Sequence, residues 1–206
     1  MRAVPAGRLA VVSSFGIESA MLLKLVAEVD KSLPVVFLDT GWLFEETLAY
    51  RDALVAALGL TDVRTIKPNP EALKERDAEK DLWMTNPDAC CALRKVEPLA
   101  GALHGFDAWI TGRKRYQGGE RTKLPVVESD RVRLKFNPLA RAEAKDITAA
   151  FREEGLPRHP LAAAGFASIG CMPCSSIARE GENGREGRWR GRGRTECGIH
   201  GYGENI

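Results

Sequence analysis

Short apolar runs alternate with longer amphipathic segments along most of the chain. Residues 9–14 (LAVVSS) and 35–38 (VVFL) are apolar runs of strand length, and residues 18–29 (ESAMLLKLVAEV) have the apolar spacing of a buried helix. The segment that begins at Phe44 (FEETLAYRDALVAALG) reads as a second helix, which ends at Gly59. The chain is therefore predicted to open as strand, helix, strand, helix.

The same alternation continues through the middle of the chain. We expect further strands at 62–66 (DVRTI), 107–111 (DAWIT) and 131–136 (RVRLKF), and further helices at 70–76, 92–105 and 145–155. Strands separated by helices predict an α/β fold, a mostly parallel twisted sheet flanked by helices. Ligands of such sheets bind beyond the carboxyl ends of the strands, where the segments SFGIES, LDTG and TGRKR lie.

The last 28 residues have a different character. From Arg179 onward they contain eight Gly and six Arg, with almost no apolar periodicity. A chain of 206 residues suits one domain. We therefore expect one domain over residues 1–178, followed by a mobile, flexible C-terminal arm over 179–206.

Charge and hydropathy exclude some classes of partner. Lys and Arg number 30 against 28 Asp and Glu, so the overall field gives no reason to expect nucleic acid or a membrane surface as the main partner. No apolar run approaches the roughly 18 to 20 residues of a membrane span, and residues 1–16 lack the apolar region of a signal peptide. These features predict a cytoplasmic protein. The sequence leaves the oligomeric state open, a homo-oligomer included.

Five cysteines in such a chain are more typical of metal ligands or reactive thiols than of disulfides. Cys90 and Cys91 are adjacent, and Cys171 and Cys174 form the motif CMPC. Four thiolates suit zinc or an iron-sulfur cluster. Adjacent cysteines favour the cluster, because neighbouring side chains can each bind a different iron. Two adjacent cysteines can bind one tetrahedral zinc ion only with strain. A zinc staple and unrelated buried cysteines are the alternatives.

The fifth cysteine, Cys197, lies in the glycine-rich arm within the segment ECGIH. Arg192, Arg194 and His200 are close to it in sequence, and cationic neighbours favour a thiolate. Cys197 is therefore a candidate nucleophile. Mobility would help it to attack a bound substrate and later meet a protein reductant. The alternative is a tail cysteine without a role.

Three segments are candidates for anion binding. The turn at 13–19 (SSFGIES) joins a strand to a helix, where backbone N–H groups favour an oxyanion, and it lacks the lysine of a triphosphate-binding P-loop. Residues 111–123 (TGRKRYQGGERTK) place five cations in one loop, which could equally be a solvated basic turn. Arg185 and Arg188 in REGRW could hold phosphate or sulfate in bidentate fashion. An RNA-binding arm is the alternative for the last segment, and its five acidic residues argue against it.

Lys95 follows Cys91 by four residues on the expected helix, so the two share a face. A lysine there could lie between an anionic cluster and an anionic substrate. The alternative is that Lys95 is an ordinary surface residue of the helix.

These motifs together resemble one family. SSFGIES, FLDTGWLFEET, CCALRKVEPL, TGRKRYQ, CMPC, REGRW and ECGIH occur in the order found in the sulfonucleotide reductases, and most resemble the branch that reduces adenylyl sulfate. The resemblance implies an adenine nucleotide alpha hydrolase-like fold, a 4Fe-4S cluster and thioredoxin as the reductant. It implies reduction of adenosine 5'-phosphosulfate to sulfite and AMP through an S-sulfocysteine.

The resemblance also implies roles for individual residues. Cys197 would be the nucleophile, and Cys90, Cys91, Cys171 and Cys174 would ligate the cluster. Lys95, Arg185, Arg188 and His200 would face the sulfate, and Arg121 would meet the phosphate. The nucleotide pocket would be lined by Ser13, Gly16, Glu18, Leu38, Asp39 and Gly112.

Three other functions remain open at this point. The first is reduction of 3'-phosphoadenosine 5'-phosphosulfate, whose branch typically lacks the four cluster cysteines. The second is a tRNA-thiolating ATP-pyrophosphatase, which needs a fuller SGGxDS loop than SSFGIES. The third is a metal-stapled module with a basic arm for RNA.

Overall fold

The computed structural model describes residues 8–129, 132–182 and 184–200. Its centre is a six-stranded sheet with the order β3-β2-β1-β4-β6-β5, in which β5 alone runs antiparallel to its neighbour. The strands are β1 (Leu9–Val12), β2 (Val35–Leu38), β3 (Val63–Ile66), β4 (Ala108–Thr111), β5 (Val127–Ser129) and β6 (Leu134–Phe136). The expected α/β class and mostly parallel sheet are confirmed.

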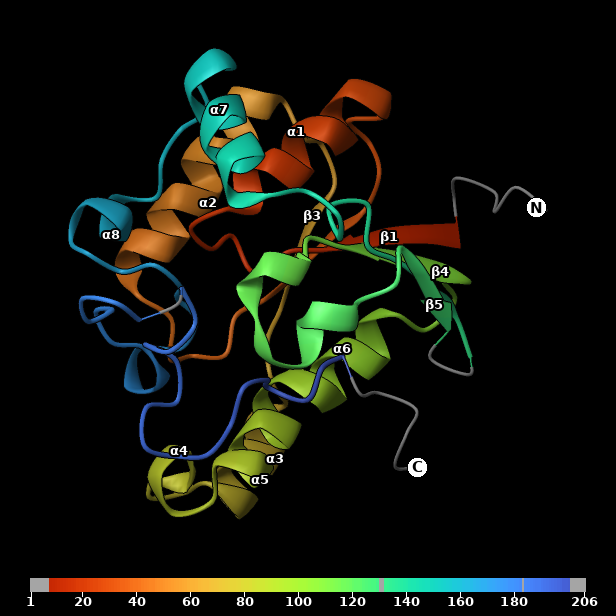
Figure 1. The fold of residues 1–206 in the computed structure, drawn as a ribbon. Coiled ribbons are helices and arrows are strands. Elements are labelled where there is room, and N and C mark those ends of the chain that lie inside the picture. Colours follow the sequence, from red (N-terminus) through yellow and green to blue (C-terminus); the bar gives the residue numbers. More distant parts are fainter. Residues whose placement is uncertain (1–7, 130–131, 183, 201–206) are drawn as a thin grey trace.

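Helices cover both faces of the sheet (Figure 1). The α-helices are α1 (Ser19–Val29), α2 (Glu45–Leu58), α3 (Pro70–Arg76), α4 (Leu82–Thr85), α5 (Pro87–Cys91), α6 (Glu97–Ala102), α7 (Ala144–Glu153) and α8 (Pro160–Ala163). A π-helix, η2 (Ala92–Val96), joins α5 to α6, and short 3-10 turns occur at η3 (Arg115–Gln117), η4 (Gly119–Lys123) and η5 (Met172–Cys174).

Alternate residues of the central strands face two separate cores. Val11, Val35 and Phe37 point into the core formed with α1, α2 and α7, while Val12 and Val36 point into the core formed with α6. This two-residue period is the one that a pleated strand imposes, and a strand covered on both faces is apolar throughout. The short, unbroken apolar runs of the sequence are therefore explained by burial on both faces.

Several local predictions agree with the structure and two do not. Gly59 ends α2 in the left-handed backbone region with a φ of 67°, as expected of a glycine that terminates a helix. The single helix expected at 92–105 is instead the π-helix η2 followed by α6. Of the strand expected at 131–136, residue 131 lies outside the described residues, and among the rest the strand is limited to Leu134–Phe136. None of the helices in the described part of the chain is both long and apolar enough to cross a membrane.

Candidate active site

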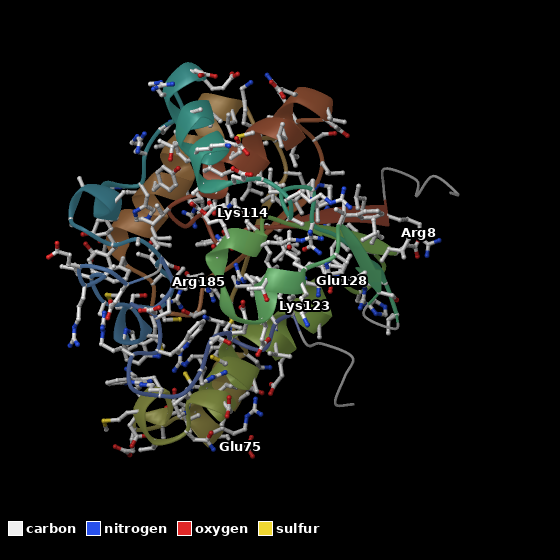
Figure 2. The ribbon with its side chains drawn as sticks, in the orientation of Figure 1. Arg8, Glu75, Lys114, Lys123, Glu128 and Arg185 are labelled. Atoms are coloured by element: carbon white, nitrogen blue, oxygen red, sulfur yellow. The ribbon has the colours of Figure 1, made fainter. Side chains whose placement is uncertain are left out.

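A pocket opens at the carboxyl ends of β1, β2 and β4, where the strand-to-helix loops converge. Its walls come from the loops after these three strands, from residues 167–170 and from residues 184–200 of the C-terminal arm. In Figure 2 the labelled Lys114 and Arg185 lie near the centre of the view, whereas Arg8 and Glu75 lie at its edge. Segments far apart in sequence therefore meet at the edge of the sheet where ligands of parallel sheets bind.

The pocket collects nearly all of the residues that the sequence analysis assigned to catalysis or substrate binding. It is lined by Cys197 and by Ser13, Gly16, Glu18, Leu38, Lys95, Gly112, Arg121, Arg185, Arg188 and His200. Asp39 does not line it: one carboxylate oxygen of Asp39 accepts the N–H of Gly41 at 3.1 Å and the other lies 3.7 Å from the ammonium of Lys67. The substrate contacts of all these residues stay predictions.

The loop between β1 and α1 is held in a strained turn. Phe15 has a φ of 47°, which is unusual for a residue with a side chain, and its ring is fully buried edge-to-face against Phe37 at 5.3 Å. Within the turn, the N–H of Gly16 donates to the hydroxyl of Ser19 at 2.8 Å. No described side chain caps the first N–H groups of α1, which leaves that end of the helix available to an anion.

Glu18 ties this turn to the loop after β4. Its carboxylate accepts hydrogen bonds from the ammonium of Lys114 at 3.0 Å, from the amide of Gln117 at 2.9 Å and from the hydroxyl of Tyr116. Burial lowers the pKa of Lys114, and the adjacent Glu18 acts against that shift. Sequence reasoning marked this basic loop but did not single out Lys114, which is 2% exposed.

Arg188 is fixed deep in the pocket by its neighbours. Its Nε donates to the carbonyl of Cys174 at 3.1 Å, and its guanidinium lies 4.4 Å from the ring centre of Trp189. The guanidinium also lies against the backbone of Gly170, where a Cβ atom would collide with both of its terminal nitrogens. Glycine at position 170 is therefore required for the close approach of Arg188.

The four paired cysteines border a second, smaller cavity. Cys90 and Cys91 form the last turn of α5, and Cys171 and Cys174 bracket η5. The loop after β2 holds the second pair, since Leu43 forms a β-bridge with Cys171 and the N–H of Met172 donates to the carbonyl of Trp42 at 2.7 Å. The cavity is lined by Cys90, Cys91, Cys171 and Cys174 together with Trp42, Trp83, Pro87, Arg94, Lys95 and Pro173.

Burial and charge affect the four thiols differently. Burial raises the pKa of Cys90 to about 11 and also raises the pKa values of Cys91 and Cys174. Burial acts in the same direction on Cys171, but Lys95, the hydroxyl of Thr40 and Arg188 outweigh it and lower the pKa of that thiol. Thr40 Oγ1 lies 3.2 Å from Cys171 Sγ. Cys171 is thus the thiol whose surroundings most favour a thiolate.

Lys95 lines both cavities, and so connects them. It lies on η2, whose wider turn keeps a residue four positions after Cys91 near the same face. Burial alone would lower the pKa of its ammonium, but the negative charges of Cys171, Cys197 and Cys91 outweigh burial and raise it. Lys95 is therefore a cation between the cysteine cavity and the thiol of Cys197.

His200 closes the far side of the pocket. Its ring stacks in parallel on that of Trp109 with 5.9 Å between centres, and its carbonyl accepts from the ammonium of Lys135 at 2.9 Å. Burial, and then the nearby Arg113 and Arg121, lower the pKa of His200 well below its usual value. These surroundings favour the neutral imidazole over the imidazolium, and the expectation that His200 faces the sulfate stays a prediction.

Comparisons with known proteins agree with this arrangement. Residues 8–177 match the sequence model of the phosphoadenosine phosphosulfate reductase domain. The chain is 52% identical over 192 residues to the adenosine 5'-phosphosulfate reductase of Mesorhizobium japonicum, covering 93% of this chain and 76% of the relative. It is 42% identical over 198 residues to the protein of the same name from Streptomyces coelicolor, covering 94% of this chain and 82% of the relative.

Solved structures show a similar fold. A phosphoadenylyl-sulfate reductase from Candida auris in complex with phosphate superposes with a TM-score of 0.69 at 27% identity, covering 83% of each chain. The FMN adenylyltransferase of Candida glabrata superposes with a TM-score of 0.57 at 16% identity, over 81% of this chain and 53% of that one. At that identity the second likeness concerns the fold alone, and it confirms the expected adenine nucleotide alpha hydrolase-like architecture.

Proposed function

The chain belongs to the phosphoadenosine phosphosulfate reductase domain family, and we propose that it reduces adenosine 5'-phosphosulfate to sulfite and AMP in sulfate assimilation. The names of its relatives at 41% to 52% identity support that substrate. The observation that carries the proposal is that Cys197 lines one pocket with Lys95, Arg185 and Arg188, while Lys95 also borders the cavity of the four cysteines.

The reaction begins with the thiolate of Cys197 attacking the sulfur of the bound nucleotide. The bond between this sulfur and the bridging phosphate oxygen breaks, AMP leaves with the electron pair, and Cys197 becomes an S-sulfocysteine. Lys95, Arg185 and Arg188 offset charge on the sulfuryl and phosphate oxygens, a role typically worth about 3 to 4 kcal/mol for one well-placed donor.

Release of sulfite requires an external dithiol, for which we propose thioredoxin. One thiolate of the reductant attacks Sγ of Cys197, the bond between Sγ and the sulfonate sulfur breaks, and sulfite leaves while a mixed disulfide forms. The second thiolate of the reductant then attacks this mixed disulfide, which closes the reductant's own disulfide and frees the Cys197 thiolate. Two electrons thus pass from the dithiol to the sulfonyl group. Because all five cysteines of the chain lie in described segments and are unpaired, we also propose a cytoplasmic, reducing location.

The four paired cysteines would hold a 4Fe-4S cluster. Two observations support this fit. The four thiols border one cavity, and the adjacent thiols of Cys90 and Cys91 suit a cluster, whose irons lie apart, better than a single zinc ion. The indole Nε1 of Trp42, a residue that lines that cavity, is buried and finds no hydrogen-bond partner among the described residues, and a cluster sulfur would accept a hydrogen bond from this N–H. When bound, the cluster would supply a fixed charge centre beside the pocket.

The experiment is an assay of anaerobically purified protein with iron and sulfide quantitation. We expect sulfite release from adenosine 5'-phosphosulfate with reduced thioredoxin, and slower release from the 3'-phosphorylated nucleotide or with glutaredoxin. Cys197→Ser should release no sulfite above background and show no sulfonated protein by intact mass, while still binding AMP. A sulfonated Cys197→Ser protein, or preference for the 3'-phosphorylated nucleotide, would contradict the proposal.

A further inference from the structure

The carboxylate of Glu196, the residue before Cys197, is bound by two arginines that line the pocket. It accepts hydrogen bonds from Nε of Arg121 and, at 2.9 Å, from Nη2 of the same side chain. Nη2 of Arg185 donates to it at 3.3 Å. The three side chains are only 9% to 15% exposed. The carboxylate of Glu196 is therefore bound by two nitrogens of Arg121 and by one nitrogen of Arg185.

The surroundings of Glu196 keep it ionised. Burial alone would raise the pKa of its carboxyl group, but Arg121, Arg185 and Arg113 outweigh burial and lower that pKa. Bidentate pairs between a carboxylate and a guanidinium are among the stronger charge-assisted hydrogen bonds. A permanent negative charge of the protein therefore lies inside the pocket that is lined by its cations.

Arg121 and Arg185 are also the groups to which the family resemblance assigns phosphate and sulfate. A guanidinium engaged by a carboxylate has fewer donors left for another anion, since its five N–H groups lie in a fixed plane. We propose that Glu196 is a positioning residue that occupies the anion site in the substrate-free enzyme, so that the phosphosulfate must take over Arg121 and Arg185 from it; this rests on the proposed function.

The exchange would move Cys197 together with Glu196. Arg185 also donates to the carbonyl of Thr195 at 2.8 Å, so residues 195–197 are held by the same side chains. Gly193 and Gly198 on either side have φ values of 62° and 85°, in the backbone region that favours glycine. Binding of the anion thus releases the carboxylate next to the nucleophile at the moment when the nucleophile is needed.

The test is the affinity of AMP, measured by calorimetry for the wild type, Glu196→Gln and a matched control. The control is Glu182→Gln, because Glu182 lies in the same arm and pairs with Arg190 but does not line the pocket. We expect Glu196→Gln to bind AMP about tenfold more tightly than the wild type, equivalent to about 1.4 kcal/mol. Glu182→Gln should bind AMP like the wild type.

Turnover separates this role from a purely structural one. We expect KM for the nucleotide to fall in Glu196→Gln, because the anion no longer has to displace a carboxylate from Arg121 and Arg185. A structural defect would instead raise KM. AMP affinity that is unchanged or weaker in Glu196→Gln overturns the inference, even if sulfite release by the wild type upholds the proposed function. If AMP binds to none of the three proteins, both proposals fail.

Discussion

The guanidinium of Arg194 lies 3.8 Å from the sulfur of Cys91, more than one hundred residues away in sequence. A second nitrogen of Arg194 lies 2.9 Å from the carboxylate of Asp88, on the same helix as Cys91. Arg192 makes an equivalent contact with the other cysteine pair, 4.0 Å from the sulfur of Cys174. The C-terminal arm therefore contacts both pairs of candidate cluster ligands, three and five residues before Cys197.

Replacing Arg194 by Gln should weaken the metal site. A guanidinium that donates to a ligating thiolate offsets its charge, and loss of an outer-shell partner of this kind typically costs about tenfold or more in metal affinity. We expect iron release to a chelator to be about tenfold faster in Arg194→Gln, with a shift of the iron-sulfur stretching bands in the resonance Raman spectrum.

Arg190→Gln is the matched control for Arg194, because Arg190 lies in the same arm but contacts no cysteine in these bonds. It donates to the carboxylate of Glu182, the hydroxyl of Ser176 and the carbonyl of Ile177. Arg190→Gln should leave both the release rate and the bands unchanged. Equal release rates for the two variants would show that Arg194 does not support the metal site.

Replacing Asp77 by Asn should strongly destabilise the fold. Asp77 and Arg94 form a buried ion pair at 2.5 Å, with side chains 0% and 7% exposed, and Arg94 also donates to the carbonyl of Thr40 at 2.9 Å. Removing one partner leaves a buried charge uncompensated, at a cost of about 3 to 5 kcal/mol in the free energy of unfolding. Urea denaturation measures this loss.

The exposed pair of Arg76 and Glu97 is the control for the buried one. Both side chains are more than 40% exposed, so Glu97→Gln should cost at most about 1 kcal/mol. A similar small loss for Asp77→Asn would mean that the buried pair contributes little to the stability of the fold.

Acid should destabilise the protein through His159, whose side chain is buried. Its Nδ1 accepts the N–H of Leu161 at 3.2 Å, so the proton is on Nε2, 3.1 Å from the hydroxyl of Thr47. Burial lowers the pKa of His159 to about 4, below the value of about 6.5 in the unfolded chain. The unfolded state therefore takes up the proton first as the pH falls.

The contribution of His159 is complete above pH 6.5 and is lost between about pH 6.5 and 4, by up to about 3 kcal/mol. Urea denaturation of the wild type and of His159→Gln across this range checks the sign. The stability advantage of the wild type should shrink as the pH falls, and an advantage that grows towards pH 4 would contradict this assignment.

Gly170→Ala should impair substrate binding without unfolding the protein. The three atoms nearest to the new Cβ all belong to the guanidinium of Arg188, the end of a long side chain, so the fold should tolerate the change while Arg188 leaves its place in the pocket. We expect KM for the nucleotide to rise about tenfold, about the effect of losing one charge-assisted contact. Steady-state sulfite release measures KM, and the midpoint of thermal unfolding shows whether the fold is kept.

Gly101→Ala provides the comparison, because a Cβ at Gly101 meets nothing within 4 Å and the residue lies inside α6. That variant should keep a wild-type KM and gain a few tenths of a kcal/mol to about 1 kcal/mol in stability. If Gly170→Ala also kept a wild-type KM, Arg188 would not depend on this close approach.

The sequence by itself determined the sheet and the helices that cover it. The runs at 9–12 and 35–38 are apolar at every position because both faces of these strands are buried, and Gly59 ends α2 because that turn needs a positive φ. Such features depend on neighbouring residues, so they can be read locally. The order of the motifs likewise indicated the family.

Only the tertiary structure decided how the arm meets the site. Residues 184–200 have no apolar periodicity, and sequence reasoning predicted a mobile arm; mobility itself stays a prediction. In the structure these residues are placed by ionic contacts with distant groups, such as Glu196 with Arg121 and Arg194 with Cys91. A charged side chain has no preferred sequence separation from its partner, so no local sequence pattern predicts an ion pair of this kind. Such partners come within reach only through the fold of the sheet and its loops.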